Sequence, residues 1–232
     1  DVAIPGKHGR TSEPGCLPDP AAADFGEYDL IAHTIENGAP AGICGSGLID
    51  AAARLLELGI IQYDGKLADL EQLQQMGLAA RIPPKIHKRV LGKWPEVRVL
   101  LTEEHPRHGK AVYLTQNDVR ELQLAKGTIR AAMEMLLAQR NLAPEDIDEL
   151  YLAGAFGNYI RKESAAIIGL IPRVPLDRIT FIGNAASEGA KLALLSMEER
   201  STAEREAHRV EFFEMAGRPE FQDTYMMALM FE

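Results

Sequence analysis

Apolar residues at helical spacing predict two main helices in this chain. In residues 46–58 the apolar positions recur every three or four residues, and Gly59 follows them as a helix-ending glycine. Residues 115–140 predict the longest helix, because Thr115 and Asp118 stand in capping-box positions and Asn141 is a natural stop. The stripe of this helix that we expect to face the core comprises Val119, Leu122, Ala125, Ile129, Met133 and Leu136.

Short apolar runs separated by glycine, proline and polar residues predict the strands. The expected strands are residues 28–35, 96–102, 110–114, 149–153, 178–182 and 209–215. Two of them, 149–153 and 178–182, each lead into glycine and small residues and then into a helical pattern, as a buried strand feeding a tight turn does. Strands that alternate with helices in this way indicate the α/β class.

The distribution of glycine and proline divides the chain into a short N-terminal segment and a much longer folded unit. Residues 1–40 are rich in glycine and proline and predict a partly flexible N-terminal segment, whereas residues 41–232 are expected to form one folded unit. Within that unit, residues 68–93 predict another helical stretch with a basic, proline-broken loop after it. The tail predicts a helix at 198–208 and a short helix from Pro219.

Composition narrows the classes of function. The 232 residues include 25 Lys and Arg against 34 Asp and Glu, so the net charge is −9, and 46% of the residues are hydrophobic. An acidic chain repels phosphate backbones and anionic lipid, which argues against nucleic-acid and membrane partners. Two cysteines are too few for a disulfide-rich scaffold, an iron–sulfur cluster or a cysteine-based zinc site. With neither a signal peptide nor a long apolar run, a cytoplasmic protein is expected, and the missing initial Met indicates a fragment.

The segment from Gly42 to Gly47 opens the first helix and is the first candidate ligand site. Its glycines let a ligand approach the backbone closely, and the N–H groups of the first helical turn favour an anion such as phosphate. The candidate phosphate-binding residues are Gly45, Ser46 and Gly47. The alternative is a tight turn in which Ser46 is an ordinary N-cap, because glycine-rich helix starts are common.

Two further turns of small residues follow the strands at 149–153 and 178–182. The first lies at the carboxyl end of its strand, where ligands bind in open α/β sheets, so a purine and its ribose could lie on the backbone. Its candidate residues are Gly154, Ala155, Phe156, Gly157 and Asn158. The alternatives are close strand–helix packing and a capping role for Asn158. The second turn, residues 183–190, favours tight packing, with a moving hinge contact as the alternative. Its Asn184 is a further candidate cofactor-binding residue.

Lys126 lies within the long helix, on the face opposite its apolar stripe and together with Gln123 and Arg130. The simple interpretation is a solvated face. The alternative is that Lys126 lies over the adenine of a nucleotide held by the strand turn that follows.

Two other groups are weak candidates for chemistry. His105 and His108 lie in a loop with two Glu, but two His are too few for a closed metal site, so no metal site is expected. Cys44 is expected to be a small buried residue rather than a nucleophile, because no His stands beside it in the sequence. No catalytic residue is assigned to this chain.

Five blocks of sequence, in this order, resemble the C-terminal region of the reductive activators of corrinoid enzymes. The blocks are residues 42–50, 114–126, 152–160, 169–172 and 183–186, and the tail from Val210 to Phe231 is also similar. The order of the blocks makes the resemblance specific, and it covers the chain from about residue 40 to the end.

The resemblance implies a fold, cofactors and partners. These activators carry an iron–sulfur domain, a small middle domain and an ATPase domain of the actin, sugar-kinase and heat-shock chaperone superfamily, which has a ribonuclease H-like fold. They use ATP to drive an electron onto a corrinoid cobalt that has been oxidised from Co(I) to Co(II). This chain would be the second lobe of that ATPase domain, with extra helices and a β-hairpin. ATP with Mg²⁺ would be the cofactor of the full-length parent, and the corrinoid protein and the first ATPase lobe would be partners. The iron–sulfur cluster would lie on a domain that this chain lacks.

The resemblance also assigns roles to the candidate residues. Residues 45–47 would be the second phosphate loop, residues 154–158 the adenosine motif, and Lys126 the residue presented to the adenine. Residues 183–190 would contact the first lobe as it closes, although Ser187 and Glu188 depart from the small residues usual in the family. The first phosphate loop, of the Asp-x-Gly-Thr-Thr type, is absent. The resemblance implies that the full-length parent is an enzyme. Because the first phosphate loop is absent, we expect the isolated chain to be inactive.

Two alternatives stay open. The chain could be a non-catalytic module that docks a corrinoid protein or pairs two activators as a homodimer, or a lobe of another kinase of the same superfamily. For the leading hypothesis, we expect a mainly β-sheet core with the helices 46–58 and 115–140 packed on it. The turns at 42–47 and 154–158 are then expected to face one cleft.

Overall fold

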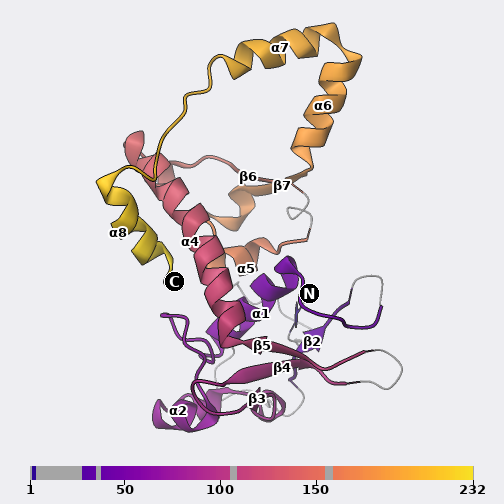
Figure 1. Ribbon diagram of the computed structural model, residues 1–232, viewed down its shortest axis with the longest axis vertical. Coiled ribbons are helices and arrows are strands. Elements are labelled where there is room, and N and C mark those ends of the chain that lie inside the picture. Colours follow the sequence, from indigo (N-terminus) through magenta and orange to yellow (C-terminus); the bar gives the residue numbers. More distant parts are fainter. Residues whose placement is uncertain (1, 4–27, 35–37, 105–108, 155–158, 232) are drawn as a thin grey trace.

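The structure is a computed structural model that describes residues 2–3, 28–34, 38–104, 109–154 and 159–231 (Figure 1). The strands in these ranges form three small sheets. The sheets are β1 (Val2–Ala3) with β2 (Ile31–Ala32), β3 (Val90–Leu91) with β4 (Arg98–Thr102) and β5 (Val112–Thr115), and β6 (Leu150–Ala153) with β7 (Ile179–Gly183). The first two sheets are antiparallel, and β6 and β7 are parallel. None of the helices described is long and apolar enough to cross a membrane.

The expectation of a mainly β-sheet core is wrong for the described residues. Their strands are two to five residues long, and no sheet has more than three of them, so the helices have to complete the core. The centre is α1 (Gly45–Glu57), whose Ala51, Ala52, Ala53 and Leu55 are fully buried. Around them pack the residues that follow α1, the β3–β4–β5 sheet and the start of α4 (Gln116–Gln139), in one hydrophobic cluster.

A second, smaller hydrophobic cluster supports the parallel pair. It contains Ala165 of α5 (Lys162–Ile167), Ile179 of β7, and Ile171 and Val174 between them. Ile160 and Leu170 pack against both clusters. The chain that follows β6 is therefore tied to the core around α1.

The ends of α4 agree with the sequence. Thr115 is its N-cap and forms the capping box with Asp118, since each side chain bonds the backbone of the other residue. Beyond the other end of the helix, Asn141 has a positive φ of 53°. Both the start and the stop that the sequence predicts are confirmed.

For the buried face of α4, in contrast, the prediction is confirmed at the start of the helix and wrong further along it. Val119 and Leu122 are buried as expected, but Ile129 and Leu136 are 49% and 48% exposed. From Lys126 onward the helix instead buries a different face, with Lys126 as its largest fully buried side chain. The reason is that α8 (Pro219–Ala228) lies along α4 and covers that face (Figure 1).

The stretch 68–93 is helical only in short pieces. These are α2 (Leu70–Gln75), a 3-10 helix (Ala79–Arg81) and α3 (Pro84–His87). Gly77 separates the first two, and Pro84 begins the third at the first helical position, where a proline costs no hydrogen bond.

The tail forms helices as predicted but lacks the predicted strand. α6 (Ala185–Leu195) and α7 (Met197–Ala207) extend from the rest of the chain as an arm, at the top of Figure 1, and neither buries a residue. Residues 209–215 are not a strand, because no described strand pairs with them, and Phe212 is 86% exposed. Two further 3-10 helices, Pro144–Asp146 and Leu176–Arg178, precede β6 and β7.

An ion pair joins the segment before α1 to the β3–β4–β5 sheet. The Arg89 Nε and Nη2 atoms donate to the two Asp29 carboxylate oxygens at 2.6 and 2.8 Å, and Arg89 Nη1 also donates to the carbonyls of Leu100 and Leu101. The hydrogen bonds from Arg89 hold the pKa of Asp29 below its usual value of 3.8.

This ion pair predicts a pH dependence of stability. Because the Asp29 pKa is lower in the folded protein than in the unfolded chain, the pair stabilises the fold above about pH 4. That stabilisation is lost as the pH falls through the folded pKa. We expect Asp29→Asn to lower the unfolding free energy by about 1–2 kcal/mol at pH 7 and by progressively less below pH 4. Urea unfolding of both proteins between pH 7 and pH 3 measures this, and a constant difference would contradict it.

Candidate functional site

The head of α1 forms the first part of the candidate site. Its N-cap is Cys44 and not Ser46, since the Cys44 Sγ accepts a hydrogen bond from the Gly47 N–H at 3.4 Å. Ser46 lies inside the first turn, with its Oγ 3.4 Å from the Cys44 Sγ. The interpretation of Ser46 as the cap is therefore wrong. The N–H groups of Gly45 and Ser46 have no intrahelical acceptor at these positions, so they are donors that an anion can use.

Cys44 differs from its expected buried environment, because it is exposed. Hydrogen bonds from the Ser46 hydroxyl and the Gly47 N–H hold the pKa of the Cys44 thiol below its usual value. A thiolate here accepts from the Gly47 N–H, which is one of the donors that a bound phosphate would use. The sulfur therefore competes with an anion at this turn.

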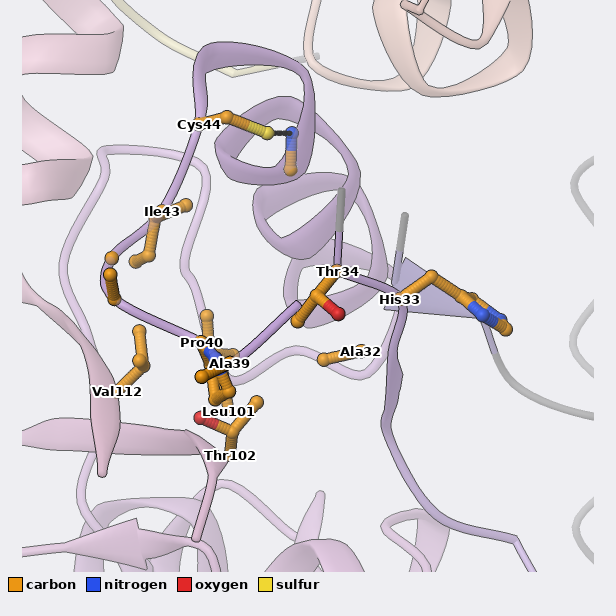
Figure 2. A pocket seen from close by; sticks show the side chains of 13 residues that line it. Ala32, His33, Thr34, Ala39, Pro40, Ile43, Cys44, Leu101, Thr102 and Val112 are labelled. Carbon is orange, nitrogen blue, oxygen red and sulfur yellow. Dashed lines mark hydrogen bonds between the residues drawn. The ribbon is translucent and has the colours of Figure 1, made fainter. Parts of the chain in front are cut away.

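A small cavity lies beside this turn (Figure 2). Its volume is about 240 Å³, and its walls are mostly apolar, with His33, Thr34 and Thr102 as polar exceptions. Ligand sites for larger molecules usually exceed about 300 Å³. The cavity is therefore too small to be the whole nucleotide site, although Cys44 and Gly47 contribute to its wall.

The parallel pair brings the other two turns together. Gly154 follows β6 with a φ of +104°, and its N–H donates to the Gly183 carbonyl at 2.7 Å. A Cβ at Gly154 would meet no atom within 4 Å, so the space beside its backbone is open. Asn184 directly follows β7 and caps α6 by accepting from the Ser187 N–H at 3.2 Å. The other residues of the candidate adenosine motif, Ala155, Phe156, Gly157 and Asn158, lie outside the described residues.

The interpretation of residues 183–190 as a tightly packed helix start is wrong for the described chain. No residue of α6 is buried, and Leu194 and Leu195 are 75% and 84% exposed. The small residues at 183–190 therefore have no close helical neighbour among the described residues.

The segment that returns from the Gly154 turn packs on α1. Ile160 contacts the core around α1, and the Arg161 Nε lies 3.6 Å from the Asp50 Oδ2 within α1. The helix that follows the turn at 42–47 therefore also holds the segment from Tyr159 to Arg161. Whether the turns at 42–47 and 154–158 face a single cleft stays a prediction, because most of the second turn is not described.

Lys126 is not on a solvated face, so that interpretation is wrong. Its side chain is 1% exposed and its Nζ donates to the Met230 carbonyl, while it lies 5.1 Å from the centre of the Phe231 ring. Gln123 donates to the Leu229 carbonyl at 2.9 Å, so two side chains of α4 hold the main chain of the C-terminal segment. The role of Lys126 at an adenine stays a prediction.

The sequence pattern gave no role to Asp50 and Arg161, and it placed Arg130 on a solvated face, which is wrong because the structure places all three residues at packing interfaces. Arg130 is 8% exposed, and its Nη1 donates to the Ile171 carbonyl at 2.8 Å, which joins α4 to the second cluster. A signal for Asp50 exists in the sequence, because a carboxylate between Ile49 and Ala51 in an apolar helix face indicates a buried charge. No described group of three or more His, Cys, Asp and Glu could hold a metal ion, and His105 and His108 lie outside the described residues.

The known proteins to which this chain is similar are named for the activation or reduction of corrinoid proteins. A corrinoid activation enzyme, RamQ of Eubacterium limosum, is 35% identical over 204 residues, which cover 88% of this chain and 33% of that protein. The Co(II) methylated amine-specific corrinoid protein reductase of Methanosarcina barkeri is 25% identical over 192 residues, which cover 82% and 29%. The chain thus spans about a third of the length of these curated relatives.

The solved structure of a reductive activator for a corrinoid, iron–sulfur protein matches with a TM-score of 0.73 and 28% identity, over 88% of this chain and 30% of that one. The expected actin-like α/β class is thereby confirmed. A family model described as the C-terminal domain of RACo, the ASKHA domain, matches residues 6–232. Because that match spans nearly the whole sequence, the chain belongs to the family of C-terminal ASKHA domains of RACo.

Proposed function

We propose that this chain is the C-terminal nucleotide-binding lobe of an ATP-dependent reductive activator that returns Co(II) corrinoid proteins to Co(I) for methyl transfer. Its family and the functions for which its relatives are named support this proposal. The observation that carries the site is the parallel pairing of β6 and β7. It sets Gly154, with a left-handed backbone and open space beside it, next to the turn that starts α6.

The residues present fit part of a nucleotide. The head of α1 offers backbone N–H donors for phosphate, and the open space at Gly154 admits a flat ring against the backbone. Mg²⁺ would be held through the phosphates and the first lobe of the domain, because the described residues contain no cluster of metal ligands. The proposed partner is a corrinoid protein. The iron–sulfur cluster of the full-length protein would lie on another domain. The proposed location is the cytoplasm.

The direct test uses the full-length protein with a Co(II) corrinoid protein and a reductant. We expect the absorption change of Co(II) to Co(I) to depend on added ATP with Mg²⁺. Reduction at the same rate and extent without nucleotide would overturn the proposed function.

The isolated 232-residue chain should bind ATP weakly and should not hydrolyse it. The first lobe would supply part of the phosphate contacts, and each lost charge-assisted hydrogen bond costs about 1.5–3 kcal/mol. Two such losses weaken binding roughly a hundredfold or more relative to the full-length protein. Calorimetric titration of both proteins with ATP and Mg²⁺ measures the difference. Submicromolar affinity or steady hydrolysis by the chain alone would contradict the prediction.

A docking function is the second candidate, and the arm of α6 and α7 favours it. Leu194 and Leu195 of α6 are 75% and 84% exposed, and Phe212, in the segment after α7, is 86% exposed, so a partner surface would cover apolar side chains in and beside the arm. If docking is the whole function, the full-length protein should bind a corrinoid protein equally well with and without ATP. Binding that changes with nucleotide instead favours the proposed ATPase lobe.

A further inference from the structure

Asp50 is a buried carboxylate in the middle of α1. Its side chain is 0% exposed, and neither carboxylate oxygen has a hydrogen-bond partner within the described parts of the chain. Its ion-pair partner is Arg161, whose Nε lies 3.6 Å from the Asp50 Oδ2. That separation is longer than a hydrogen bond, which normally spans about 2.7–3.2 Å.

Stability alone does not account for this arrangement. A buried carboxylate loses its hydration, and a distant partner does not restore the lost energy. The neighbouring Ala51, Ala52 and Ala53 are also fully buried, so an apolar side chain at position 50 would suit the environment better. Buried polar groups without partners are rare in native proteins, and each needs a specific explanation.

The position of Arg161 supplies that explanation. Arg161 is the N-cap residue of α5, three residues after Asn158, and its side chain is 36% exposed. The neighbouring Lys162 is engaged elsewhere, because its Nζ donates to the Leu176 carbonyl at 2.7 Å. Asp50 therefore attracts Arg161, and not Lys162, toward α1, the helix that begins at the phosphate turn.

We infer that Asp50 is a positioning residue, which acts through Arg161 to hold the segment leaving the Gly154 turn at a fixed place against α1. The pair thereby sets the backbone at Gly154, where the described part of the chain before this segment ends, relative to the phosphate turn, so that one nucleotide can contact both. This inference rests on the proposed function. It assigns to Asp50 and Arg161 a role in nucleotide affinity in addition to their packing.

The test measures nucleotide affinity and thermal stability of the full-length protein in parallel. The variants are Asp50→Asn, Arg161→Met and the double variant, with Mg·ADP as the probe in calorimetric titration. Glu57→Gln is the matched control, because it removes a carboxylate from the same helix whose partner, Arg54 at 2.5 Å, lies in the last turn. Arg161→Lys keeps the charge and serves as the conservative variant.

We expect each single variant to weaken Mg·ADP binding about tenfold or more, and the control and Arg161→Lys to change it by less than about threefold. The double variant leaves no buried unpaired charge, so its melting temperature should recover while its affinity stays low. Recovery of both stability and affinity in the double variant would overturn the inference, since that is the result of a purely structural pair.

Failure of the inference is separable from failure of the proposed function. Normal Mg·ADP binding by the wild type together with equal binding by Asp50→Asn removes the inference alone. No binding of Mg·ADP or Mg·ATP by the wild type removes the proposed function, and the inference with it.

Discussion

Gly154→Val in the full-length protein should abolish the proposed ATP-dependent corrinoid reduction and leave the iron–sulfur absorption spectrum unchanged. Gly154 has a φ of +104°, which L side chains rarely adopt and a β-branched Val adopts least readily. The Val side chain would also enter the open space in which the purine is proposed to lie. The cluster would sit on another domain and should not respond. The rate of Co(I) formation and the visible spectrum are the two measurements.

Gly77→Val is the matched control for this variant. Gly77 also has a positive φ, of +70°, with no atom within 4 Å of an added Cβ, and it lies in the turn after α2, outside the candidate site. Both substitutions bring backbone strain of about 1–3 kcal/mol, and only the one at Gly154 should remove activity. Equal losses of activity and of melting temperature in the two variants would point to strain alone. A folded Gly154→Val with normal nucleotide binding would remove the adenosine-site assignment.

Phe231→Ala should be the most destabilising change in the tail, at about 3–5 kcal/mol. Phe231 is 4% exposed, its ring lies beside the Lys126 ammonium, and its N–H donates to the Tyr63 carbonyl at 2.8 Å. Loss of the ring leaves a cavity over Lys126 and weakens the contact of α8 with α4. Urea unfolding of the chain measures the change in free energy.

Phe212→Ala makes the same chemical change at a side chain that is 86% exposed, and it should cost less than about 0.5 kcal/mol. A second readout is labelling of Lys126 by an amine-reactive acylating reagent. The 1% exposed ammonium of the wild type should resist labelling, whereas Phe231→Ala should expose it. Equal costs for the two Phe variants and equal labelling would contradict the docked tail.

Local signals in the sequence predicted the elements well. The capping box at Thr115 and Asp118 fixed the start of α4, and the strand patterns at 149–153 and 178–182 correspond to β6 and β7. These features depend on neighbouring residues and on backbone chemistry, which a single sequence contains. The resemblance to the corrinoid activators was likewise carried by short ordered blocks and is confirmed by the family match.

The parts that failed depend on distant partners. Helical periodicity placed Ile129 toward the core, but α8 and the residues after it, which follow about 90 residues later in the chain, pack on α4 and bury Lys126 instead. The expected strand at 209–215 lacks a described neighbour with which to pair, and alternation alone cannot supply one. The N-cap was predicted at Ser46 but lies at Cys44, because the cysteine sulfur accepts a hydrogen bond from a backbone N–H of the first turn. The usual capping preferences do not include cysteine.

The hold of α4 on the C-terminal segment constrains how related chains can diverge. Gln123 and Lys126 recognise the carbonyls of Leu229 and Met230, and a carbonyl is present whatever side chain a residue carries. Exchange of Met230 for another residue therefore keeps the donor matched to its acceptor. An insertion or deletion of one residue between Ala228 and Phe231 would instead move every carbonyl out of register with its donor and carry the Phe231 ring away from Lys126. Relatives that keep Gln123 and Lys126 should accordingly vary here in residue identity and agree in length.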